Sequence, residues 1–143
     1  RYMLDQAHGA ETELRRLRDL GHKICVDDFG TGYSSLAYMK RLPLNVIKVD
    51  RSFINNVPYD DNDCAISGAI ISLSHNLGYK VVAEGVETQE QMNYLIDKDC
   101  NYAQGYFFGK PVPANAFAAQ VDAINERLTI ASGWTARIRA IRL

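Results

Sequence analysis

The amino-acid sequence predicts an α/β fold in which four parallel strands alternate with helices. Four short apolar runs have the length and composition of buried strands, and they lie at residues 24–27, 46–50, 81–83 and 102–104. The segments between them show helical spacing or residues that end helices. This alternation is typical of a parallel sheet with crossover helices, and both a flavodoxin-like sandwich and part of a (β/α)₈ barrel fit it.

The first half of the chain is predicted to hold two helices and two strands. Leucine recurs at helical spacing before a glycine that provides a C-terminal stop: Leu14, Leu17, Leu20 and Gly21. Residues 24–27 follow as a buried strand. A short helix is predicted over residues 34–41 and ends before Pro43, because a proline disfavours helical backbone at the preceding residue. Residues 46–50 form the second strand.

The second half repeats the pattern. An acidic turn at residues 60–63 caps a long helix, and the third strand at residues 81–83 ends in Glu84. Thr88 and Gln91 have the spacing of a capping box, which predicts the start of another helix.

A short fourth strand and a last helix complete the predicted elements. The strand at residues 102–104 precedes Gly105, and two prolines separate it from the helix. The helix carries apolar residues at helical spacing: Phe117, Val121, Ile124 and Leu128.

Length and composition indicate one globular domain. The chain has 143 residues, of which 47% are hydrophobic and 23% charged. No apolar run approaches the roughly 20 residues that a membrane helix needs, and no signal peptide is recognised, so we expect a cytoplasmic protein without a membrane segment. Because Arg1 is not a methionine, the natural start is expected upstream.

The cysteines lack metal or disulfide spacing and are expected to be buried free thiols: Cys25, Cys64 and Cys100.

Charge is distributed unevenly along the chain. All 17 acidic residues precede Arg127 together with 12 of the 16 lysines and arginines, so the body carries a net charge of −5 and the remainder +4. An acidic body gives no reason to expect binding to a nucleic-acid polymer.

Charged side chains gather at the predicted carboxyl ends of the strands, where α/β folds build active sites. Asp27 and Asp28 end the first strand, Lys48 lies in the second and Glu84 ends the third. These carboxylates would repel one another unless the lysine or a divalent cation neutralised them, and oxygen ligands suit Mg²⁺ or Mn²⁺ rather than zinc. A solvated turn and the Asp-Phe-Gly motif of protein kinases are the alternatives. A protein kinase is disfavoured because the other kinase motifs, the glycine-rich loop and the catalytic loop, are missing from the sequence. A solvated turn is disfavoured because Lys48 and Glu84 follow the two aspartates at a matching spacing.

Four stretches of the sequence resemble motifs of a known family, and they occur in the same order and at the same spacing. They are VDDFGTGYSSL at 26–36, IKVDRSF at 47–53, VVAEGVET at 81–88 and QGY at 104–106 continuing to Pro111. They resemble the EAL-domain cyclic di-GMP phosphodiesterases, over most of residues 10–120. The resemblance implies a (β/α)₈ TIM-type barrel of which this chain holds strands five to eight. We therefore expect residues 1–128 to be a partial EAL domain without its N-terminal half and residues 129–143 to be a basic tail of unknown role.

The resemblance implies roles for individual residues. The family hydrolyses one phosphodiester bond of cyclic di-GMP with two divalent metals, here expected to be Mg²⁺ or Mn²⁺. Asp27 resembles the carboxylate that bridges both metals, and Asp28 and Glu84 resemble ligands of the second. Lys48 resembles the lysine that orients the attacking water, Glu84 also has a general-base role in the family, and Glu87 resembles its supporting carboxylate. The wall that contacts the substrate is matched by three residues: Gln104, Gly105 and Pro111.

Other family ligands are missing. The Glu-Ala-Leu triplet of the first strand does not occur in the sequence, and neither do the asparagine of the third strand and the glutamate of the fourth. By resemblance the first metal keeps only bridging Asp27, so we expect the isolated chain to be inactive.

Half a barrel would leave two open sheet edges, which predicts a partner. Either a homodimer closes an eight-stranded barrel around a two-fold axis, or a partner chain supplies the missing half. The alternative functions are a non-catalytic regulatory module that binds nucleotide or protein, and a cryptic fragment that folds as an oligomer.

Overall fold

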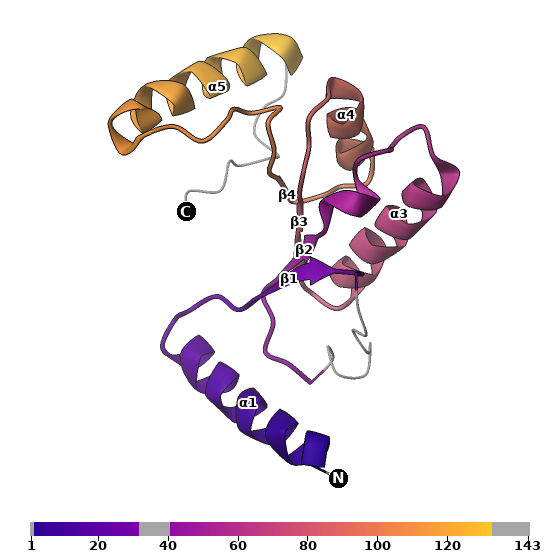
Figure 1. The fold of residues 1–143 in the computed structure, drawn as a ribbon, viewed down its shortest axis with the longest axis vertical. Coiled ribbons are helices and arrows are strands. Elements are labelled where there is room, and N and C mark those ends of the chain that lie inside the picture. Colours follow the sequence, from indigo (N-terminus) through magenta and orange to yellow (C-terminus); the bar gives the residue numbers. More distant parts are fainter. Residues whose placement is uncertain (1, 32–40, 133–143) are drawn as a thin grey trace.

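The computed structural model describes residues 2–31 and 41–132 of the chain. Its elements follow one another in the order α1 (Tyr2–Asp19), β1 (Cys25–Phe29), β2 (Val46–Val49), a 3₁₀ turn η1 (Arg51–Phe53), α3 (Asp61–Asn76), β3 (Lys80–Ala83), α4 (Gln89–Asp97), β4 (Tyr102–Ala103), a second 3₁₀ turn η2 (Ala114–Ala116) and α5 (Phe117–Ser132) (Figure 1). The four strands form one parallel sheet in the order β1-β2-β3-β4, which confirms the predicted α/β fold. The helix predicted over residues 34–41 lies outside the described residues except for Arg41.

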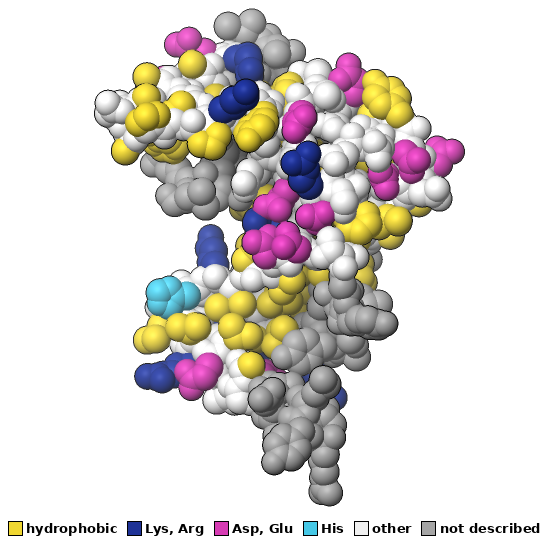
Figure 2. Space-filling model, in the orientation of Figure 1, with side chains coloured by type: hydrophobic (Ala, Val, Ile, Leu, Met, Phe, Trp, Pro, Cys, Tyr) yellow, Lys and Arg dark blue, Asp and Glu magenta, His cyan; other side chains and the backbone are white. Residues whose placement is uncertain are grey.

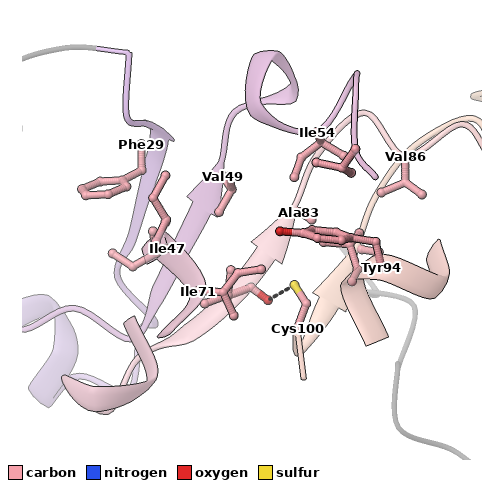
Figure 3. Packing of buried hydrophobic residues seen from close by; sticks show 14 of the residues in the cluster. Phe29, Ile47, Val49, Ile54, Ile71, Ala83, Val86, Tyr94 and Cys100 are labelled. Atoms are coloured by element: carbon pink, nitrogen blue, oxygen red, sulfur yellow. Dashed lines mark hydrogen bonds between the residues drawn. The ribbon is translucent and has the colours of Figure 1, made fainter. Parts of the chain in front are cut away.

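One face of the sheet packs against α3 and α4 and forms the hydrophobic core (Figure 3). Side chains alternate between the faces of a strand, so every second residue of β2 and β3 points to this side. Ile47, Val49, Val81 and Ala83 are each 0% exposed there. The helices contribute apolar residues to the same cluster: Ile70, Ile71, Met92 and Leu95. Removal of this apolar surface from water is what holds the sheet to its two helices.

The opposite face of the sheet has a different character. By the strand register its side chains include Cys25, Val46 and Lys48, followed by Val82 and Tyr102. In Figure 1, α3 and α4 lie on one side of the strands, whereas α1 and α5 lie toward opposite ends of the molecule. This face therefore mixes polar and apolar side chains, unlike the core face.

The expectation that all three cysteines are buried is wrong for Cys25. Cys100 is buried and Cys64 partly buried, but Cys25 is exposed, and all three are free thiols. Cys25 begins the edge strand β1 and points away from α3 and α4, so nothing in the core covers it.

Capping side chains fix the starts of α3 and α4, as the sequence predicts. Asp60 caps α3 by accepting a hydrogen bond of 2.8 Å from the backbone N–H of Asp63. Thr88 and Gln91 form the complete capping box at the start of α4. Asp50, just after β2, accepts from the N–H of Ser52 and starts the 3₁₀ turn.

The first and last helices extend beyond the core. Leu17 of α1 and Leu20, just after the helix, are 42% and 68% exposed, so the described residues leave this part of the predicted apolar stripe uncovered. Helix α5 begins at Phe117 and continues to Ser132, so the expected boundary after residue 128 falls inside it. Among the described residues, none of the helices combines the length and apolar character that crossing a membrane requires.

The core face can be tested by a pair of matched substitutions in α3. Ile71 is 1% exposed and Ile66 is 42% exposed. We expect Ile71→Val to lower the free energy of unfolding by about 0.5–1.5 kcal/mol, because it removes a buried methylene. Ile66→Val is expected to change it by less than about 0.5 kcal/mol. Urea unfolding followed by circular dichroism measures both, and equal losses would contradict the assignment of the core face.

Candidate functional site

Lys48 lies at the centre of a charged cluster at the carboxyl ends of the strands. Its Nζ is 2.6 Å from Oδ1 of Asp27 and 2.5 Å from Oε1 of Glu84. Lys48 is on β2, which pairs with β1 on one side and β3 on the other, and Glu84 directly follows β3. The ammonium can therefore reach carboxylates from both neighbouring strands. Figure 2 shows acidic side chains gathered over the middle of the molecule, with basic side chains next to them.

The ion pairs favour the charged forms of Lys48 and Asp27. Partial burial disfavours the ammonium of Lys48, but its hydrogen bonds to Asp27 and Glu84 outweigh burial and raise the pKa of Lys48 above its ordinary value. The hydrogen bond from Lys48 also lowers the pKa of the Asp27 carboxyl. At neutral pH Lys48 is therefore an ammonium and Asp27 a carboxylate.

A β-bulge brings Asp27 and Asp28 to the same side of the sheet. Adjacent residues of a regular strand point to opposite faces. In β1, however, Val26 pairs with Ile47 and Phe29 pairs with Val49, so two aspartates stand opposite the single residue Lys48. Asp28 takes up the extra length with a left-handed backbone, φ 49°. Aspartate adopts this conformation more readily than most residues.

The bulge completes a group of three carboxylates. Ligand oxygens of Asp27, Asp28 and Glu84 all lie within 4.8 Å of one another. The side chain of Asp27 is 64% exposed and that of Glu84 is 18% exposed, so water has access to one side of the group. An all-oxygen set that leaves room for water fits Mg²⁺ or Mn²⁺, which complete their coordination with water, and it lacks the nitrogen and sulfur ligands typical of zinc.

Two glycines allow the loops around the cluster to approach closely. A Cβ on Gly85 would lie 2.6 Å from the Cβ of Arg51, and its φ of +70° is left-handed. A Cβ on Gly105 would lie 2.0 Å from the carbonyl oxygen of Val86. The segment after β3, which begins with Glu84, is thus fixed between the segment after β2 and the segment after β4.

The other predicted site residues lie around this cluster. Glu87 is exposed in the turn before α4, where its N–H donates to Oε1 of Gln91 at 2.7 Å, and it is not one of the three clustered carboxylates. Gln104 is exposed after β4, and its backbone joins it to Ala83 and Val86. Pro111 is exposed. The structure therefore brings Asp27, Asp28, Lys48 and Glu84 together, and the roles of Glu87, Gln104, Gly105 and Pro111 stay predictions.

The sequence interpretation missed the backbone features that build the cluster. Two adjacent aspartates on a strand predict opposite directions unless a bulge lies between them. Gly30, two residues after Asp28, was the available signal, since aspartate and glycine both favour irregular backbone. Gly85 and Arg51 are far apart in the sequence, so no local sequence pattern predicts their contact.

Comparison with known proteins identifies the class of this chain. The family model of the EAL domain matches residues 2–111, so the chain belongs to the EAL domain family. It is 53% identical over 103 residues to the cyclic di-GMP phosphodiesterase NbdA of Pseudomonas aeruginosa, covering 72% of this chain and 13% of that protein.

Solved structures agree with this assignment. The structure of the MucR phosphodiesterase of P. aeruginosa in complex with c-di-GMP has a TM-score of 0.73 and 47% identity, covering 78% of this chain and 45% of that one. The manganese/cy-diGMP complex of Klebsiella pneumoniae BlrP1 has a TM-score of 0.64 and 36% identity, covering 70% and 26%. The chain thus spans less than half of these structures, and the predicted identity as the C-terminal half of an EAL-type barrel domain is confirmed.

The left-handed backbone at Asp28 gives a stability test that does not depend on the carboxylate. Asp28→Ala and Asp28→Gly both remove the charge, but only alanine places a Cβ in the left-handed region. We expect the alanine variant to be about 1 kcal/mol less stable than the glycine variant in urea unfolding with EDTA present. At Lys80, in the regular strand β3, the order is expected to be reversed. The same order at both positions would contradict the bulge.

Proposed function

We propose that this chain provides the C-terminal half of a cyclic di-GMP phosphodiesterase site, in which Asp27, Asp28 and Glu84 hold one Mg²⁺ or Mn²⁺ ion. One observation carries the proposal: three carboxylates with ligand oxygens within 4.8 Å of one another surround a lysine, in a member of the EAL domain family. The manganese/cy-diGMP complex of BlrP1, a relative at 36% identity, supports the choice of ion and ligand.

In this proposal Glu84 and Lys48 act on the attacking water. A carboxylate of Glu84 accepts the proton of the water as a general base, and the ammonium of Lys48 holds that water and offsets the charge that develops on it. Glu87 supports Glu84 from the next turn. A bound divalent ion supplies charge neutralisation and makes the water more acidic. Contacts to the dinucleotide come from the wall after β4: Gln104, Gly105 and Pro111.

We further infer that these 143 residues do not hydrolyse cyclic di-GMP by themselves. The resemblance assigns three of the four ligands of the first metal to strands that this sequence does not contain. Those ligands would come from another polypeptide, or a second copy would close the sheet by joining β4 to the β1 edge of its partner.

A second candidate is a regulatory module that binds the dinucleotide without turnover. It is favoured by the same incomplete ligand set together with the retained cluster around Lys48. The two candidates differ in whether a complementary half restores hydrolysis.

Metal binding is the first test. We expect Mn²⁺ to bind the full chain, as followed by loss of the free-ion signal in electron paramagnetic resonance. Glu84→Gln is expected to weaken binding by about tenfold or more, because it removes a charged ligand. Glu90→Gln changes an exposed acid in the first turn of α4 and is the matched control, with an expected change below about twofold. Equal effects of the two substitutions would contradict the assigned ligands.

Cyclic di-GMP separates the candidates. With Mg²⁺ or Mn²⁺ present we expect no hydrolysis by the chain alone, as measured by chromatography of the linear dinucleotide. Hydrolysis that Glu84→Gln abolishes would contradict the inferred inactivity. Binding without hydrolysis, even after addition of a complementary half, would favour the regulatory module. No binding under any condition would contradict both candidates.

Oligomeric state tests how the sheet is closed. If a second copy closes it, light scattering at micromolar concentrations is expected to give twice the chain mass of 16.0 kDa. Dilution should return the monomer, as mass action requires. A monomer throughout the micromolar range would exclude closure by a second copy and leave a different polypeptide as the source of the other half.

A further inference from the structure

We propose that Lys48 is the counter-cation of the carboxylate cluster when no metal is bound, and that a divalent ion displaces its ammonium from Asp27 or Glu84. The inference rests on the proposed metal site and adds a competition to it: the same lysine that completes the site lowers its affinity for the ion.

The competition follows from the two carboxylates that are shared. Nζ of Lys48 is 2.6 Å from Oδ1 of Asp27 and 2.5 Å from Oε1 of Glu84. A divalent ion would take up oxygens of the same two residues at about 2.1 Å. An ammonium and a divalent ion on the same two carboxylates would lie within a few Å of each other and repel strongly. One of the ammonium contacts must therefore open when the ion binds.

Asp28 provides the place where the ion first meets the cluster. It belongs to the group of three carboxylates, but the ion pairs of Lys48 among the described residues go to Asp27 and Glu84. Within residues 2–31 and 41–132, no ion pair of an ammonium with Asp28 competes with an incoming cation. The β-bulge thus places one unshared carboxylate beside two that Lys48 already neutralises.

Burial keeps the released ammonium close to the site. The side chain of Lys48 is 23% exposed, and it extends from an inner strand of the sheet. On the same face of β3, its register neighbour Val82 is 2% exposed. The side chain cannot swing fully into water without moving its neighbours, so after displacement the ammonium stays beside the carboxylates.

A lysine at another position of the same sheet face provides the control. In the register of β2 and β3, Lys80 pairs with Val46, and two residues further along Val82 pairs with Lys48. The side chain of Lys80 therefore projects from the same face as that of Lys48, but at the opposite end of β3. Lys80 is exposed. Its replacement by methionine removes one positive charge from this face and leaves the cluster untouched.

The test compares Mn²⁺ affinity of the full chain in four forms: wild type, Lys48→Met, Lys48→Arg and Lys80→Met. We expect Lys48→Met to bind Mn²⁺ about three- to tenfold more tightly than wild type, because both the competitor and its repulsion are gone. Lys80→Met is expected to change the affinity by less than about twofold. Lys48→Arg keeps the charge and should stay within about twofold of wild type. Electron paramagnetic resonance of free Mn²⁺ measures all four.

Metal-free stability provides a second readout. In EDTA, Lys48→Met leaves Asp27 and Glu84 without their counter-ion, and its melting temperature is expected to fall by about 3–6 °C relative to Lys80→Met. Saturating Mn²⁺ should then raise the melting temperature of Lys48→Met by more than that of wild type.

The outcomes separate this proposal from the metal site on which it rests. Weaker Mn²⁺ binding by Lys48→Met than by wild type would overturn the counter-cation proposal and show that Lys48 merely positions the carboxylates. Equal Mn²⁺ affinities of wild type and Lys48→Met would overturn the counter-cation proposal, whereas the proposed metal site would still stand. Absence of Mn²⁺ binding in all four forms would overturn the metal site and the proposal together.

Discussion

Lys48 stands on an inner strand, and its ammonium contacts carboxylates from the strands on either side, Asp27 of β1 and Glu84 after β3. Three carboxylates whose oxygens lie within 4.8 Å of one another are unfavourable without a cation among them. Their positions are set by the backbone: the bulge at Asp28 turns two adjacent side chains to one side, and Gly85 lets the end of β3 approach Arg51. The arrangement of strands and turns at this edge of the sheet is therefore stabilised by one lysine.

The two faces of the sheet have different roles: one forms the hydrophobic core, and the other carries the charged cluster. Against α3 and α4 the strands present Ile47, Val49 and Val81, all fully buried. The other face carries Lys48 and the cluster, and the charged groups stand at its rim. The EAL-domain structures that share this fold extend well beyond the matched region.

Local patterns were sufficient for the order of elements but not for the geometry of the site. Apolar runs located all four strands, and the caps at Asp60 and Thr88 fixed the starts of α3 and α4, because a cap is a contact within a few residues of sequence. The bulge at Asp28 was not predicted, since it shows only in the register between two strands. The exposure of Cys25 was missed for a related reason: the apolar run predicts a strand but does not say which of its faces the helices cover.

Closure of the sheet would change the electrostatics of the cluster as well as its ligand set. The side chain of Asp27 is 64% exposed, whereas those of Lys48 and Glu84 are 23% and 18% exposed. The cluster is therefore most exposed to solvent at β1, the strand that carries Asp27. Charge–charge interactions weaken several-fold between a protein interior and water. A general base and an ammonium that act on a water molecule need that interaction to be strong at the moment of proton transfer. A strand paired to the β1 edge would therefore strengthen the proposed chemistry even without ligands of its own, because it would remove bulk water from the side where Asp27 is most exposed.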